Sequence, residues 1–187
     1  MRPVYRRLYP FRFVQPYPHV YRTYAKGRWI GKELLATLVK EFKAYPPEYY
    51  EQCVLNGMIM VNNAKVACDY VIKNGDQILH TSIRTEPPCL DLPVEIVQET
   101  EDYVVICKPP SLIVHTGGGH HFNTVEGLLK YEMGYENLHV LHRLDKQTSG
   151  LLVFARSKEK VALFHEESGN ESMKKMYFAR VAGEVKW

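Results

Sequence analysis

The sequence around Asp145 suits a carboxylate that takes part in a reaction. Asp145 stands between Arg143 and Lys146, and the small residues Thr148–Gly150 follow it. The apolar run Leu151–Phe154 then predicts a buried strand. A carboxylate between cations at the end of a core strand adds little stability, because exposed ion pairs are weak. The pattern instead suits a nucleophile or a base held beside a polyanionic substrate.

Basic charge is concentrated at the N-terminal end of the chain. Residues 1–32 hold eight Lys or Arg and no acid, whereas residues 33–187 hold 16 basic and 21 acidic groups. Five tyrosines are interleaved with these cations, at positions 5, 9, 17, 21 and 24. Cations that neutralise phosphates and rings that stack on bases suit a nucleic-acid partner. Packing within the fold, a solvated tail and a mitochondrial targeting segment are the alternatives, although prolines at positions 3, 10, 16 and 18 oppose one long presequence helix.

Size and composition indicate an ordinary globular protein of one or two domains. The chain has 187 residues, 45% of them hydrophobic and 24% charged. It has no signal-peptide core, and no apolar run approaches the roughly 20 residues of a membrane span. Four widely separated cysteines without a CxxC pair argue against a zinc ribbon or a disulfide framework and favour a reducing compartment.

Composition and hydrophobic periodicity together divide the chain into four segments. Residues 1–29 form a basic, proline-rich arm, and residues 30–84 form a small module. Residues 85–92 form a linker in which Pro87 and Pro88 prevent a central strand, and residues 93–187 form a second domain. We therefore expect an α+β protein.

The small module is predicted to contain two helices followed by short strands. Helical spacing over residues 30–42 predicts the first helix, and a second begins at Pro46-Pro47 and ends at Asn56-Gly57. Hairpin strands are expected at Ile59–Val61 and Tyr70–Leu79 around Asn-Asn and Asn-Gly turns. This order resembles the S4-like RNA-binding module of ribosomal proteins. The resemblance implies that basic residues near the first helix contact RNA: Arg28, Lys32, Lys40 and Lys43. The alternative is that these side chains only solvate the face of the helix.

The second domain carries three motifs in a characteristic order. A strand at Val94–Val97 precedes one at Tyr103–Cys107, which runs into Lys108-Pro-Pro and reaches His115. Asn123-Thr124 is expected to cap a helix over Val125–Met133. A strand at Leu138–Leu141 then delivers the sequence His-Arg-Leu-Asp-Lys-Gln-Thr-Ser-Gly at 142–150. A helix capped by Ser157 follows, and Lys175–Gly183 reads as a last strand of the pattern K-x-Y-x-A-x-V-x-G.

These three motifs resemble those of the RluA-type RNA pseudouridine synthases, whose active-site motif is HRLDxxTSG. Ser111 stands where that family often has glycine. The resemblance implies a mixed, mainly antiparallel catalytic sheet and a reaction that converts uridine to pseudouridine. It makes Asp145 the catalytic residue and places Arg143 in the base stack vacated by the everted uridine. It also puts His142 on the RNA path and Tyr177 against the uracil. Without the surrounding motifs, Asp145 would read as a turn carboxylate paired with a neighbouring cation.

The reaction is an isomerisation without redox change, so no cofactor is expected. Within this family, the sequence most resembles the eukaryotic branch of RPUSD-two-like and yeast Pus-nine- or Rib-two-like proteins. This resemblance implies that the partner is RNA, with tRNA expected first and mRNA or rRNA as alternatives. No association with a membrane is expected. The expected compartment is the cytoplasm or nucleus, with the mitochondrion as an alternative.

Two further features of the sequence bear on its function. Gly117–Gly119 and the histidines at 115, 120 and 121 suggest a loop that contacts RNA, an inert loop, or a metal site. The histidine spacing fits no standard ligand pattern, so no metal is expected, and no Gly-Lys-Ser/Thr follows to make a nucleotide-phosphate loop. The family also carries a later R-x-H-Q-I/L-R motif that this sequence lacks, which predicts a truncated chain. The alternative function is therefore a non-catalytic RNA-binding remnant.

Overall fold

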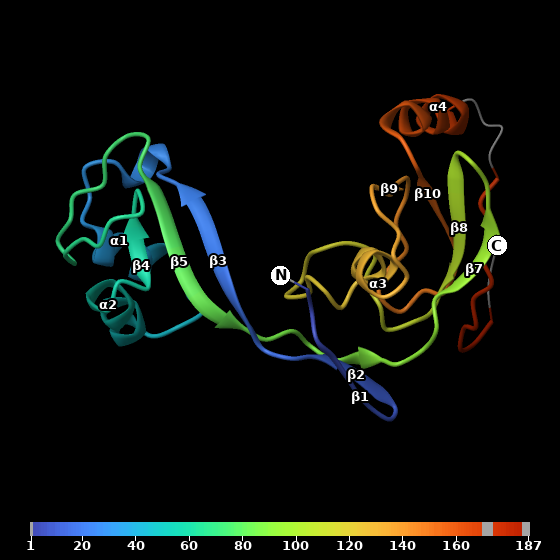
Figure 1. Ribbon diagram of the computed structural model, residues 1–187, viewed down its shortest axis with the longest axis horizontal. Coiled ribbons are helices and arrows are strands. Elements are labelled where there is room, and N and C mark those ends of the chain that lie inside the picture. The colour runs from blue at the N-terminus through green and yellow to red at the C-terminus, as the bar shows by residue number, and fades with distance from the viewer. Residues whose placement is uncertain (1, 170–173, 185–187) are drawn as a thin grey trace. The chain divides into compact units, whose positions relative to one another are not determined.

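The computed structural model of the chain describes residues 2–169 and 174–184. It is a mixed α+β structure with antiparallel sheets, which confirms the predicted fold class at this level (Figure 1). The chain divides into two compact units, one of residues 15–85 and one that joins residues 1–14 to residues 86–187. No helix in the described part of the chain is both long enough and apolar enough to cross a membrane.

The unit of residues 15–85 is built on a three-stranded antiparallel sheet. Its order is β3 (Tyr17–Tyr24), β5 (Gln77–Arg84) and β4 (Ile59–Val61). The helices are η1 (Gly27–Trp29), α1 (Leu34–Glu41) and α2 (Pro47–Leu55). The apolar faces of the helices and sheet meet in one buried cluster, in which Trp29, Leu34, Val54 and Ile59 are almost fully enclosed.

The local signals of this unit are confirmed at the helices and at one turn. Proline begins α2, and Gly57 follows it with a φ of 70°, as a left-handed cap requires. Asn62 and Asn63 have φ values of 52° and 63° in the turn after β4. The predicted strand over Tyr70–Leu79 is wrong before Gln77.

Side-chain hydrogen bonds explain that difference. The buried Asp76 carboxylate accepts hydrogen bonds from the Tyr70 hydroxyl at 3.0 Å, the Asn62 amide at 2.9 Å and the Lys73 backbone N–H at 2.8 Å. Such bonds give the backbone an alternative to a strand ladder.

The basic arm is not a tail, contrary to one of the expected alternatives. Its first part forms β1 (Tyr5–Leu8) and β2 (Phe11–Val14), and β2 pairs with β6 (Cys89–Leu90). Its second part is β3, which pairs with β5 over eight residues. The structure divides the chain after residues 14 and 85. The expected boundary after residue 84 lies within one residue of the second division, whereas the one expected after residue 29 differs from the first. Long-range strand pairing, which local composition does not encode, accounts for the difference.

The other unit contains the sheet that carries the candidate site. Its antiparallel strands lie in the order β7 (Glu95–Glu99), β8 (Tyr103–Lys108), β10 (Gly150–Ala155) and β9 (His139–Val140). The helices are α3 (Val125–Tyr131) and α4 (Lys158–Gly169). All of these elements were predicted, with ends shifted by a few residues.

Their caps and core also follow the sequence. Thr124 accepts a hydrogen bond from the backbone N–H of Gly127 at 2.9 Å, as an N-cap does. The Ser157 hydroxyl accepts one from the backbone N–H of Lys160 at 3.3 Å. Alternate residues of β8 and β10 enter the core, where Val104, Leu152 and Phe154 have no exposed surface.

The last predicted strand is wrong. Residues 174–184 form no strand, and Met176 and Phe178 are fully or almost fully exposed. An extended segment becomes a strand only through hydrogen bonds to a neighbour, and none of the described strands pairs with this segment.

Candidate active site

The loop between β9 and β10 holds Asp145 at the surface of the sheet. The backbone N–H of Thr148 donates a hydrogen bond of 3.1 Å to the Asp145 carbonyl oxygen, which closes a tight turn after the acid. Gly150 then begins β10 with a φ of 126°, a conformation that favours glycine. The Asp145 residue is exposed. Its carboxylate is therefore accessible to a substrate, while its backbone is fixed by the turn and the strand.

A buried lysine supports this loop from below. Lys108 ends β8, has no exposed surface, and donates hydrogen bonds to the carbonyls of Pro109 at 2.9 Å, Leu112 at 2.7 Å and Lys146 at 3.3 Å. Three acceptors match the three protons of an ammonium group. Burial lowers the pKa of Lys108 to about 8, while the negative charge of Asp145 acts to raise it. Lys108 therefore connects the two central motifs and places positive charge near the acid.

Arg143 belongs to the same loop and lies beside a histidine of the first motif. Its guanidinium Nη1 is 3.4 Å from Nε2 of His115. Both residues line a cavity of about 490 Å³ together with Thr116, Glu126 and His142. Arg143 is exposed, so the guanidinium is available to a ligand that enters this cavity.

His142 points toward the sheet. Its Nε2 accepts a hydrogen bond of 3.3 Å from the backbone N–H of Val153. Its ring lies parallel to that of Phe164, with 6.4 Å between centroids. Burial lowers the pKa of His142, and the positive charge of Lys175 lowers it further. These contacts attach the motif to β10 and α4.

Tyr177 lies near the same motif. It lines a cavity of about 770 Å³ whose walls include Thr148–Gly150 of the motif and Phe164 of α4. Tyr177 is 66% exposed, and Lys174 and Lys175 line the cavity with it. The structure thus brings Tyr177 beside residues that follow Asp145 in the chain, with positive charge around them.

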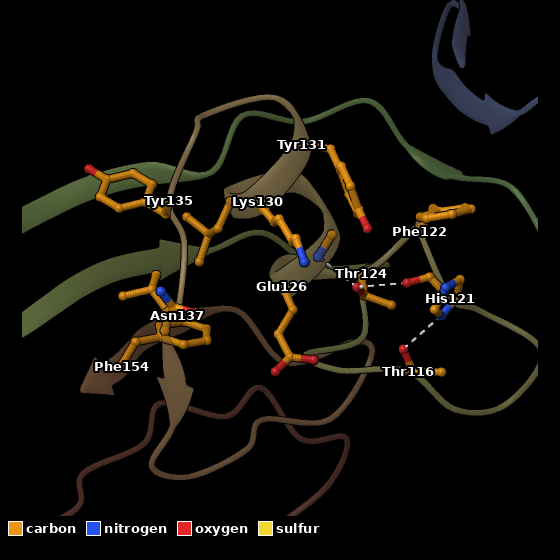
Figure 2. Close-up of a pocket in the computed structure, with 13 residues that line it drawn as sticks. Thr116, His121, Phe122, Thr124, Glu126, Lys130, Tyr131, Tyr135, Asn137 and Phe154 are labelled. Atoms are coloured by element: carbon orange, nitrogen blue, oxygen red, sulfur yellow. Dashed lines mark hydrogen bonds between the residues drawn. The ribbon is translucent and has the colours of Figure 1, made fainter. Parts of the chain in front are cut away.

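A further cavity, of about 320 Å³, lies along α3 (Figure 2). Glu126 lines both this cavity and the one at Arg143. Burial raises the pKa of Glu126, and the nearby His115 opposes that shift.

The three histidines of the glycine loop face different surroundings. His115 lies beside Arg143, His120 is 3% exposed, and His121 Nδ1 is 3.1 Å from the Thr116 hydroxyl. Within residues 2–169 and 174–184, no group of three His, Cys, Asp or Glu side chains is arranged to hold a metal ion.

The four basic residues predicted to contact RNA belong to the unit of residues 15–85. Lys32 and Lys40 line one surface hollow of about 260 Å³ beside α1. Arg28 forms a bidentate ion pair with Glu41, which also lines that hollow. Lys43 instead donates a hydrogen bond of 3.2 Å to the Val39 carbonyl. Three of the four are therefore near one another, and Lys43 is engaged at the end of the helix.

Two residues of the site were missed by the sequence reasoning. Lys108 occupies the inward register of β8, two and four residues after the buried Ile106 and Val104, so the alternating pattern could have revealed its burial. Glu86 lies in the expected linker, where no local pattern indicates its partners at residues 121–123.

Comparison with known proteins identifies a family for the part of the chain that contains this site. Residues 102–186 match the family described as RNA pseudouridylate synthase. The chain is 41% identical over 174 residues to the pseudouridylate synthase RPUSD2 of Homo sapiens, an alignment that covers 92% of the chain and 32% of that protein. It is 38% identical over 172 residues to the RNA pseudouridine synthase 7 of Oryza sativa subsp. japonica, with 92% and 44% covered. It is 34% identical over 175 residues to the mitochondrial tRNA pseudouridine(32) synthase of Saccharomyces cerevisiae, with 94% and 38% covered.

The chain spans between about a third and a half of the length of these curated relatives. The family match includes the Asp145 loop, the buried Lys108 and the segment of Tyr177. Residues 102–186 therefore form a domain of the RNA pseudouridylate synthase family.

Proposed function

We propose that this protein is an RNA pseudouridine synthase in which Asp145 is the catalytic carboxylate. The observation that carries the proposal is the placement of an accessible aspartate on a turn supported by a buried ammonium group. In the reaction, the bond between N1 of uracil and C1′ of ribose breaks, and a bond between C5 and C1′ forms. The C5 proton is lost and N1 takes up a proton, so the reaction is an isomerisation without net consumption of any reagent.

The chain supplies the groups that this reaction needs. A uridine in folded RNA must leave its stack before a carboxylate can reach its sugar, which costs a few kcal/mol. Arg143 is exposed beside the site, and it takes the place of the everted base. Tyr177 offers a largely exposed ring that stacks on the uracil. Asp145 then acts on C1′ as nucleophile or base. His142 acts by attaching the motif to β10 and stays near the RNA.

The unit of residues 15–85 serves as the RNA-binding module of this enzyme, and we propose that it is S4-like. Two helices followed by β4 and β5, with cations gathered beside α1, support this assignment. Arg28, Lys32, Lys40 and Lys43 neutralise phosphates in it. The proposed substrate is tRNA, because two relatives from Saccharomyces cerevisiae are named tRNA pseudouridine synthases. The proposed compartment is the cytoplasm or nucleus, or the mitochondrion, which the name of one of them includes.

The decisive experiment measures tritium release from RNA labelled at C5 of uridine. The unmodified chain should release tritium, Asp145→Asn should release none, and both should bind RNA equally. Asp69→Asn is the matched control, because it removes the same charge from an exposed position. RNA binding without tritium release by the unmodified chain at any concentration would reject the synthase proposal. It would leave RNA binding as the activity of this chain.

A further inference from the structure

Glu86 holds the main chain of a distant loop with its carboxylate. The backbone N–H groups of His121, Phe122 and Asn123 donate to it at 2.9–3.0 Å, and Glu86 is 8% exposed. Three consecutive amides directed at one anion form a rigid cradle, and bonds to a charged acceptor are stronger than neutral ones. Glu86 is therefore a fixed anchor for this loop.

The anchored residues close a short hairpin loop over His115–Asn123. Gly117 and His120 exchange backbone hydrogen bonds of 3.0 and 2.8 Å, and Gly118 and Gly119 turn between them with φ values of 52° and 85°. The Thr116 hydroxyl lies 3.1 Å from Nδ1 of His121, which joins the two sides of the loop (Figure 2). These internal bonds join the two sides of the loop, so an anchor at residues 121–123 also restrains residues 115 and 116.

The far end of the loop reaches the candidate active site. His115, its first residue, has Nε2 3.4 Å from the guanidinium of Arg143. Thr116, the next residue, lines the cavity that Arg143 also lines. A displacement of the loop therefore alters both the surroundings of Arg143 and the wall of this cavity.

We propose that Glu86 is a positioning residue, which fixes the loop of residues 115–123 so that His115 orients Arg143 for the everted nucleoside. The inference rests on the proposed function, because it assigns Arg143 its role in uridine eversion. A carboxylate suits the task, since all of its lone pairs accept, whereas the amide of glutamine would direct N–H bonds toward N–H groups. Aspartate is one methylene shorter and withdraws the anion from the cradle.

The contact itself is tested without any activity measurement. Amide hydrogen exchange at residues 121–123 should become at least tenfold faster in Glu86→Gln than in the unmodified chain. Glu101→Gln, which removes the same charge from an exposed turn, should leave these rates unchanged. Equal protection in Glu86→Gln and the unmodified chain would overturn the proposal. If Glu86→Gln does not fold, Glu86→Asp takes its place with the same expected direction.

The route through His115 is tested by a double-mutant cycle on tritium release. Glu86→Gln should lower kcat/KM by about 10- to 100-fold, the scale of a misplaced active-site group, at a temperature where thermal melting shows every variant folded. In a His115→Ala background the same change should cost less than about threefold, because the link is already broken. Equal costs in the two backgrounds would overturn the route.

Failure of the proposed function gives a different result. An unmodified chain that releases no tritium rejects the synthase, whatever Glu86 does. The same cycle is then measured as the dissociation constant for RNA, with Arg143→Ala included. If the effects of Glu86→Gln and His115→Ala on the dissociation constant are not additive, the positioning role is supported. If the two effects are additive, the positioning role is rejected.

Discussion

The ammonium group of Lys108 donates a hydrogen bond of 3.3 Å to the backbone carbonyl of Lys146, the residue that follows Asp145. These two lysines come from different motifs, 38 positions apart, and the bond connects the end of β8 to the turn that carries the acid. The sheet is thus more than a scaffold for Asp145, since one of its buried side chains reaches the loop directly.

Replacing this lysine should weaken both the fold and the reaction. Lys108→Met leaves three carbonyls without their donor in a buried position, at a cost of about 1–3 kcal/mol for each group left unsatisfied. It also frees the turn at Asp145, so kcat should fall by about tenfold or more. Chemical denaturation and tritium release measure the two effects. Lys158→Met, at an exposed position, is the control and should change neither. Full activity in a folded Lys108→Met variant would contradict the supporting role.

The titration of Lys108 should act on stability and on activity in opposite directions. The folded protein releases this proton near pH 8, whereas a lysine in the unfolded chain keeps it to about 10.5. Between these values the unfolded state binds more protons, so this group makes the free energy of unfolding rise with pH. Activity should fall over the same range, because the neutral amine loses one donor and its charge.

Denaturation and rate profiles between pH 7 and 10.5 measure the two trends. The difference between the unmodified chain and Lys108→Met isolates the contribution of this side chain. An activity profile that is flat through pH 8 to 10 would show that the charge of Lys108 does not matter to the reaction.

The N-terminal hairpin should be necessary for the stability of the unit that carries the site. Arg12 of β2 is 2% exposed and donates to the Asn123 side chain at 3.3 Å, the Asp91 carboxylate at 3.4 Å and the Cys89 sulfur at 3.2 Å. Arg12→Met removes these three bonds, while Asp91 keeps its ion pair with Arg7, so the free energy of unfolding should fall by about 1–3 kcal/mol. Arg6→Met on β1 is exposed and should stay within about 0.5 kcal/mol of the unmodified chain. Equal melting curves for the two variants would refute this role of the hairpin.

The hollow beside α1 should contribute to RNA affinity by charge alone. Lys32 and Lys40 line it together, so Lys32→Ala/Lys40→Ala should weaken binding to RNA of any sequence. Each lost phosphate contact should also reduce the slope of log affinity against log salt by about 0.7–0.9. Titrations at several salt concentrations measure this, with the exposed Lys65→Ala as control. An unchanged slope in the double variant would exclude this hollow from the RNA interface.

The sequence by itself determined the parts of this protein that depend on local chemistry. Proline and glycine set the ends of α2, Thr124 capped α3, and alternating apolar residues produced β8 and β10. The order of the motifs likewise indicated Asp145, because the residues around it are contiguous in the chain. Each of these signals is read within about ten residues.

Only the tertiary structure decided how distant segments join. It paired β3 with β5, gave the first hairpin to the other unit, and left residues 174–184 without a strand partner among the described residues. It also placed Glu86 on amides 35–37 positions away and Lys108 under the Asp145 turn. Strand pairing and buried polar contacts depend on which groups meet in space, and the local sequence does not identify partners that are distant along the chain.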